Sequence, residues 1–318
     1  MDKRLDSLDA LRGFDMFFIT GGSALLAALG TLITGDARSW IAVQMTHATW
    51  TEPLRIYDFI FPLFLFIAGV TFPFSTEKRL ARGDSKRAVT FNIIRRTLTL
   101  VVLGLLFEQV QKLDWPHFRV WSVVGRIGIA WGAAAMLTLH CRFRTCVAIT
   151  AALLVGWWLF LRLVPAPDAV GTDALADRMN CFATWFDTHY LTTAHRHEGG
   201  LATIAMLPTA FFGIWSSSYA LLAGGISLIL LAAFHWVIDV KGYKAWSFYF
   251  RVIGMNAVTI YFVQRFVPFK QIGTFFLGAL PQAFSVPGWA PFVEAFGRCL
   301  FAWLFLYILY RNKVFFKA

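Results

Sequence analysis

Apolar stretches of about 18 or more residues recur along the whole chain, and they restrict its fold more than any other feature. The stretches are continuous rather than alternating, which favours membrane-spanning helices over the strands of a barrel. Only 15% of the residues are charged, whereas a soluble domain has about 25%. The sequence therefore predicts an all-α, polytopic transmembrane helix bundle of about nine or ten spans, built as a single integral-membrane domain over residues 1–318. The expected spans are 14–34, 56–75, 92–110, 122–139, 145–164, 201–216, 218–238, 251–268 and 297–311.

The basic residues set the expected orientation. Residues 77–96 contain seven lysines and arginines, so we expect them on the cytoplasmic side, and counting back places the N-terminus in the cytoplasm as well. His47 then lies on the outer side of the membrane. The net charge of +11 follows from the same bias, so membrane lipids rather than nucleic acid are the expected partners.

Beyond residue 200 the count of crossings becomes inconsistent. Nine crossings would leave the basic segments 239–244 and 311–318 outside, although both should lie inside. One more crossing between residues 213 and 219 would resolve both conflicts, but this stretch has no room for it. Residues 273–284 are short and interrupted by proline, so we expect them to be interfacial or re-entrant rather than spanning.

The stretch HATWTEPLRIYDFIFPLFLFIAG places His47 and Asp58 just before a long apolar run. A neutral imidazole can act as a nucleophile or a proton-accepting base. If the intervening loop folds back, Asp58 can orient the His47 ring as in a catalytic pair. The structural alternatives are a histidine in an aqueous loop and an aspartate that caps the following helix.

Two groups of arginines are candidates for binding a phosphorylated cofactor. Arg12 lies within a turn of Asp9 and Asp15, and Arg95 and Arg96 end the basic segment 77–96. The forked donors of arginine suit phosphate oxygens. A solvated cluster of ion pairs is the alternative for Arg12.

Other polar residues lie inside or beside the apolar runs. Arg126 needs a partner such as Asp58 or Glu108, unless it reaches back to the interface. Asn256 either bonds two helices together or orients a substrate. The HRHEGG segment at 195–200 lacks the spacing of a helical zinc motif, and the four cysteines show no ligand spacing either, so no metal is expected.

Eight blocks carry a family resemblance: RLDSLDALRGFDM, HATW, YDFIFPLFLFIAG, GRIGIAW, EGGLATI, SSSYALLAGG, GMNAVTIYF and LYILYRNKVF. In this order they resemble the transmembrane acetyltransferase family of heparan-α-glucosaminide N-acetyltransferase, through its bacterial relatives. The resemblance implies a bundle in the bacterial inner membrane that uses cytosolic acetyl-CoA as co-substrate. The acceptor would be an amino sugar or glycan on the periplasmic side, and a homodimer is a further implication.

The resemblance also implies roles for individual residues. His47 matches the active-site histidine, Asp58 matches its neighbouring aspartate, and Trp50 and Glu198 fall in blocks that would contact the substrate. Arg126 and Asn256 match family positions that could stabilise the thioester oxyanion, Arg126 on the cofactor side and Asn256 on the substrate side. Whether His47 carries the acetyl group or only accepts a proton is left open by the sequence.

Two other functions remain as alternatives. A transporter or flippase for a sugar or a lipid-linked sugar would need similar polar groups inside the membrane but no cofactor site. A truncated, inactive family member would account for the missing crossing. The family pattern also departs here, since Gly125 replaces the usual glutamine and Thr51 follows Trp50 where the family has asparagine.

Overall fold

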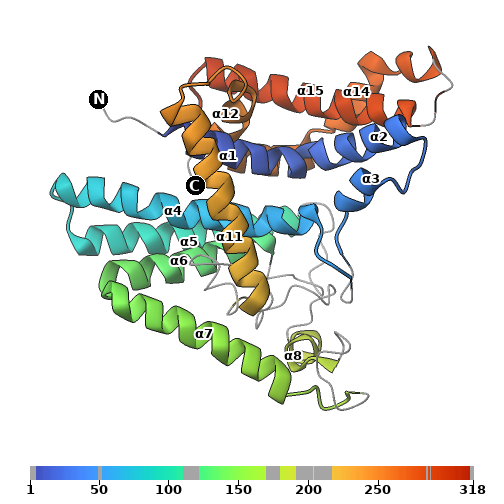
Figure 1. Cartoon of the computed structure of the whole chain (residues 1–318). Coiled ribbons are helices and arrows are strands. Elements are labelled where there is room, and N and C mark those ends of the chain that lie inside the picture. Colours follow the sequence, from blue (N-terminus) through green and yellow to red (C-terminus); the bar gives the residue numbers. More distant parts are fainter. Residues whose placement is uncertain are drawn as a thin grey trace. The chain divides into compact units, whose positions relative to one another are not determined.

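A computed structural model describes residues 5–48, 52–109, 122–169, 180–190, 203, 217–283, 286 and 288–315 (Figure 1). Across these residues the regular elements are helices, and the only strand-like pairing is an isolated bridge between Pro165 and Cys181. The prediction of an all-α fold is therefore confirmed. The chain divides into two compact units, the first unit from residues 1–64 and 228–317 and the second unit from residues 65–227. The single-domain organisation stays a prediction.

Within the described ranges, seven helices are long and apolar enough to cross a membrane, which supports an integral-membrane protein. They are Asp6–Thr34, Ile56–Ala81, Lys86–Phe107, Val123–His140, Phe143–Leu163, Leu222–Val240 and Trp289–Arg311. Apart from Thr203, the expected span 201–216 lies outside the described residues, as does most of the stretch 213–219 where a crossing was missing. The expected span 251–268 is instead two helices, α12 (Phe248–Met255) and α13 (Ala257–Phe266), which meet at Asn256.

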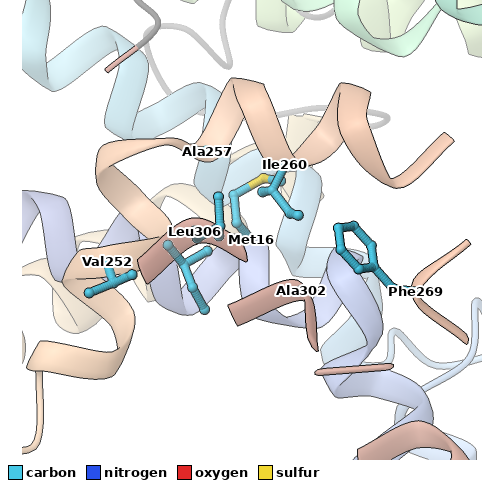
Figure 2. Close-up of a cluster of buried hydrophobic side chains, with 8 residues drawn as sticks. Met16, Val252, Ala257, Ile260, Phe269, Ala302 and Leu306 are labelled. Carbon is cyan, nitrogen blue, oxygen red and sulfur yellow. The ribbon is translucent and has the colours of Figure 1, made fainter. Parts of the chain in front are cut away.

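In the first unit, α1 (Asp6–Phe17) packs closely on α12 because both helices carry a glycine where they cross. A Cβ atom on Gly13 would lie 1.7 Å from the carbonyl oxygen of Phe250, and one on Gly254 would lie 1.8 Å from that of Asp9. Around this crossing, buried apolar side chains from α1, α12, α13, α14 (Phe269–Leu277) and α15 (Trp289–Arg311) form a core (Figure 2). This contact explains why the first helix starts at Asp6, eight residues before the expected span.

The first span is interrupted near its middle. A π-helical turn, η1 (Phe18–Gly22), separates α1 from α2 (Ser23–Thr34), and Gly21 adopts a φ of 138° that side chains rarely allow. Helix α2 ends at Gly35, whose φ of 72° is the usual left-handed stop. A short helix, α3 (Trp40–Gln44), follows, and the Ser39 side chain caps it by accepting a hydrogen bond from Ala42 N.

The first unit also contains elements near the two positions where the chain passes between the units, and two helices, α4 (Ile60–Ala81) and α11 (Ser217–Phe234), extend across these boundaries. After α3 come a 3₁₀ turn, η2 (Ile56–Phe59), and α4, and the boundary between the units falls inside α4. In the C-terminal half, α11 ends in a π-helical turn, η5 (His235–Val240). The expected interfacial segment 273–284 comprises the end of α14 and a 3₁₀ turn, η6 (Leu280–Ala283).

In the second unit, α5 (Lys86–Gln109) and α6 (Val123–His140) form the most closely packed pair. Glycines permit this contact, because a Cβ atom on Gly132 would lie 2.1 Å from the Thr97 hydroxyl oxygen. Helices α7 (Phe143–Leu163) and α8 (Phe182–Tyr190) follow in the chain. The turn between α4 and α5 holds the basic residues expected at the cytoplasmic side, and Arg79 Nε bonds Asp84 Oδ2 there at 2.7 Å.

Candidate active site

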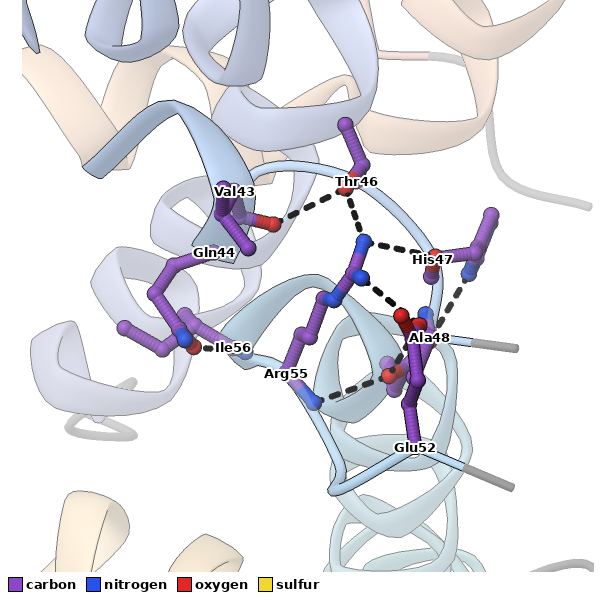
Figure 3. Close-up of polar contacts among 9 residues, drawn as sticks. Val43, Gln44, Thr46, His47, Ala48, Glu52, Arg55 and Ile56 are labelled. Atoms are coloured by element: carbon purple, nitrogen blue, oxygen red, sulfur yellow. Dashed lines mark hydrogen bonds and ion pairs between the residues drawn. The ribbon is translucent and has the colours of Figure 1, made fainter. Parts of the chain in front are cut away.

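His47, which follows α3, and Asp58 of η2 lie side by side, an arrangement that the sequence left conditional on the intervening loop. His47 Nδ1 lies 2.9 Å from Asp58 Oδ1 (Figure 3). Asp58 is mostly buried, with 13% of its side chain exposed, whereas 75% of the His47 side chain is exposed. The aspartate is thus a fixed anchor, and the imidazole that it holds faces outward from the first unit.

Asp58 performs both of the tasks that the sequence offered as alternatives. Its Oδ2 atom accepts hydrogen bonds from Arg55 N at 2.9 Å and Ala48 N at 3.3 Å, while Oδ1 faces His47. Asp58 lies in the first turn of the helix that leads into the apolar run, where a carboxylate is favoured by the unsatisfied backbone donors. Helix capping and ring orientation therefore depend on the same carboxylate.

Arg55 ties the two sides of this loop together, a role that the sequence analysis missed. Its Nη1 donates to His47 O at 3.0 Å and also to the Thr46 hydroxyl, and its Nη2 donates to Glu52 Oε2 at 2.7 Å (Figure 3). The Gln44 side chain adds a further link by accepting from Ile56 N at 3.1 Å. In the sequence, the charged and apolar residues of TEPLRIYD are the only signal for this role of Arg55, because the partners of Arg55 depend on the fold of the loop.

The chemistry available to His47 follows from these contacts. Because a carboxylate only accepts hydrogen bonds, Asp58 favours the tautomer that carries its proton on Nδ1 and leaves a lone pair on Nε2. The Tyr57 ring packs edge-on against the imidazole with centroids 4.7 Å apart, which restricts the ring further. An oriented imidazole with an available Nε2 can act as a general base or as a nucleophile.

Arg12 lies in the first unit among other charged residues near the start of α1. Arg12 Nη1 is 3.6 Å from Asp9 Oδ1, and Asp6 Oδ2 is 2.8 Å from Lys244 Nζ and 3.3 Å from Arg251 Nη1. The structure therefore contains the ion-pair cluster that the sequence offered as the alternative for Arg12. Within the described part of this cluster, three cations face two carboxylates.

The second unit holds the other arginines proposed for the cofactor. Arg95 and Arg96 are exposed on α5, and the Arg96 guanidinium carbon lies 4.4 Å from the centre of the Trp131 ring. Arg126 is buried in α6 with 1% of its surface exposed, so it does not reach back to an interface. Because Arg12 belongs to the first unit, the structure describes these arginines in two separate groups.

Asn256 lies at the junction of α12 and α13, buried to 1% exposure. Its Nδ2 donates to Val314 O at 3.2 Å, which supports the interpretation as a link between segments. His47 belongs to the opposite end of the first unit, because α3 packs on the last turns of α2, beside the start of α15. The 23 residues of α15 span about 33 Å, so a substrate group at His47 does not also reach Asn256. Trp50 and Glu198 lie outside the described residues.

The chain resembles curated proteins over most of its length. It is 23% identical to heparan-alpha-glucosaminide N-acetyltransferase of Homo sapiens over 420 residues, a match that covers 99% of the chain and 60% of the human protein. The chain is thus distantly similar to that acetyltransferase. The mouse protein of the same name is 28% identical over 140 residues, covering 43% of the chain and 20% of the mouse protein.

These matches confirm the resemblance drawn from the ordered sequence blocks. The chain spans about 60% of the length of the human protein that it matches. No protein-family model matches the chain.

Proposed function

We propose that this protein is a membrane-embedded acetyltransferase. It takes an acetyl group from acetyl-CoA and transfers it to the amino group of an amino sugar or glycan. The observation that carries the proposal is the His47–Asp58 pair, with Nδ1 and Oδ1 2.9 Å apart and 75% of the His47 side chain exposed. The printed names of its homologues, which are N-acetyltransferases, support the same reaction type.

His47 Nε2 can take part in two routes of acetyl transfer, and both routes have the same overall stoichiometry. In direct transfer, the amine nitrogen attacks the thioester carbonyl carbon while Nε2 accepts the amine proton. The C–S bond then breaks, and the imidazolium returns the proton to the departing CoA sulfur. In the two-step route, Nε2 attacks the thioester carbon, the C–S bond breaks and CoA leaves as the thiolate. The amine then attacks the acetyl-imidazolium, the bond between Nε2 and the acetyl carbon breaks, and the amine proton passes to the CoA thiolate. In both routes Asp58 stabilises the positive charge that the ring acquires.

The donor's phosphates need a cationic site away from His47. In the first unit, Arg12, Lys244 and Arg251 gather at the start of α1. In the second unit, Arg95 and Arg96 are exposed residues of α5. We assign the phosphates of acetyl-CoA to the cations of the first unit, with Arg95 and Arg96 as a separate candidate group, on the cytoplasmic side of the bacterial inner membrane and with the acceptor on the periplasmic side. This orientation rests on the basic turn between α4 and α5.

The test is acetyl transfer from labelled acetyl-CoA to glucosamine and a panel of small amines, using the purified chain in detergent. Changing His47 to alanine should lower the rate at least about 100-fold, because general-base catalysis contributes at least that much. His235→Ala is the matched control, since His235 Nδ1 also pairs with a carboxylate, Asp239, at 3.0 Å. Equal rates for wild type and His47→Ala would contradict the proposal, as would a wild-type chain that neither transfers acetyl nor binds acetyl-CoA.

One observation favours a transporter as a second candidate. The first span is interrupted at η1, and the helical segment 248–266 is interrupted at Asn256. Interrupted helices form substrate sites in many transporters. Counterflow of labelled amino sugar into vesicles that contain the protein, in the absence of acetyl-CoA, would support transport.

A further inference from the structure

Arg298 places a positive charge deep inside the last span. It lies nine residues after Trp289 in α15, about 14 Å along the helix, while half of a hydrocarbon core is about 15 Å. Its guanidinium is half-buried, and arginine stays protonated in proteins. A charge within an apolar helix is costly, and such residues commonly pair with groups in the protein or mark a ligand path.

The described residues supply Arg298 with one polar partner. Nη2 lies 3.4 Å from Gln264 Oε1 of α13, a long hydrogen bond. Gln264 is itself oriented, because its Nε2 donates to Tyr261 O at 3.3 Å. Glu294, one turn earlier in α15, is in an ion pair with Lys270 instead. Most of the five donors of Arg298 therefore find no acceptor in the part of the chain that the structure describes.

The Arg298 side chain lies against the interruption in the first span. A Cβ atom on Gly21 would be 3.2 Å from Arg298 Cδ and 3.4 Å from Arg298 Nε, so the absence of a side chain at Gly21 makes room for the arginine. Gly21 also has the unusual φ of 138° within the π-helical turn. Such turns inside helices occur frequently at functional sites. Two features that are costly in a membrane helix thus occur at the same place.

This position lies between the two ends of the first unit that the proposed function uses. The helix from Asp6 to Thr34 has 29 residues and is about 43 Å long if its rise is uniform. Arg12 and its neighbouring cations lie at the start of this helix, and α3, which leads to His47, packs near its end. Gly21 and Arg298 lie between them, within the apolar part of the bundle.

We propose that Arg298 and Gln264 form a binding site for the carbonyl oxygens of the pantetheine arm of the acyl donor. The inference rests on the proposed function. The arm is the uncharged part of acetyl-CoA, so it can enter an apolar region where phosphates would be strongly disfavoured. Its amide and thioester carbonyls accept hydrogen bonds, and a guanidinium offers several donors in a fixed plane.

The test compares two ligands on the full chain in lipid nanodiscs, with binding measured by calorimetry. Acetyl-CoA carries the arm, and 3′-phosphoadenosine 5′-diphosphate has the same phosphates without it. Arg298→Gln should raise the Kd for acetyl-CoA about tenfold or more, the effect of a charge-assisted hydrogen bond, and leave the Kd for the nucleotide unchanged. Arg298→Lys keeps the charge but not the fork, and should give a smaller loss. Arg311→Gln, at the end of α15, is the matched control and should bind both ligands as wild type does.

Three results would overturn the inference, and they are distinguishable. Unchanged acetyl-CoA affinity in both Arg298 variants would show that Arg298 does not contact the donor, while the proposed function stands. Equal weakening for both ligands would assign Arg298 to the phosphates instead of the arm. A wild-type chain that binds neither ligand would remove the donor site altogether, and the proposed function would fail with it. Thermal unfolding of each variant identifies a loss that comes from misfolding, and Arg298→Lys then decides the outcome.

Discussion

Replacing Asp58 by asparagine should separate the two tasks of this carboxylate. The two backbone donors both contact Oδ2, and His47 contacts Oδ1. An asparagine that keeps its oxygen at the Oδ2 position must place its NH₂ group against His47 Nδ1. Two donors cannot share this contact, so the imidazole moves its proton to Nε2 and loses the lone pair that the reaction needs. A comparable exchange in a Ser-His-Asp triad lowers the rate about 10⁴-fold, and we expect a loss of about 10²–10⁴-fold here.

Asp58→Ala supplies the contrast. It removes all three hydrogen bonds, at about 1 kcal/mol each, so the free energy of unfolding should fall by about 3 kcal/mol. Asp58→Asn keeps the two backbone bonds and should lower it by only about 1 kcal/mol. Acetyl-transfer rates and thermal unfolding, followed through the 13 tryptophans, measure the two effects separately. An Asp58→Asn variant with wild-type activity would refute the proposed orientation of His47, and a fully stable Asp58→Ala variant would refute the capping role.

Three further predictions concern stability and positioning. Gly254→Ala should lower the free energy of unfolding by about 1–3 kcal/mol, and with it the unfolding temperature, because the new Cβ would lie 1.8 Å from Asp9 O. Gly156→Ala is the control and should have little effect in the same thermal scan, because Gly156 has open space around it. Asp15→Ala should raise the unfolding temperature, since both carboxylate oxygens of Asp15 are buried and have no hydrogen-bond partner among the residues that the structure describes. A lower unfolding temperature would reveal a partner outside those residues. Arg55→Gln should reduce kcat about tenfold with little change in KM, because it removes the hydrogen bond that holds the backbone at His47. Arg55→Lys should retain part of the activity that Arg55→Gln loses. An Arg55→Gln variant with wild-type kcat would exclude a positioning role for Arg55.

The sequence predicted the fold class and identified His47 and Asp58 as candidates that could pair, because both depend on local pattern. Long apolar runs specify helices in a membrane regardless of tertiary detail. His47 and Asp58 lie eleven residues apart at the edge of such a run, so a short loop suffices to bring them together. The resemblance to the acetyltransferase family depends on ordered blocks that are visible without a structure.

The interruptions and the partners of Arg298 could not be predicted in this way. The turn at Gly21 reads as one more apolar stretch, because its unusual φ depends on what packs against it. The break at Asn256 depends on its bond to Val314, 58 residues later. Arg298 was not singled out because its environment combines residues from α13 and the first span. Long-range contacts of this kind leave no mark on hydrophobic periodicity.

The central claim is that the protein passes an acetyl group to an acceptor through His47. The most direct measurement uses sealed proteoliposomes with labelled acetyl-CoA inside and the best amine acceptor outside. Wild-type protein should produce labelled, acetylated acceptor outside while the freed CoA stays inside the vesicles, and His47→Ala should not, whereas His235→Ala should match wild type. Labelled acceptor formed equally by His47→Ala, or none formed by wild-type protein that retains acetyl-CoA binding across the whole amine panel, would contradict the account.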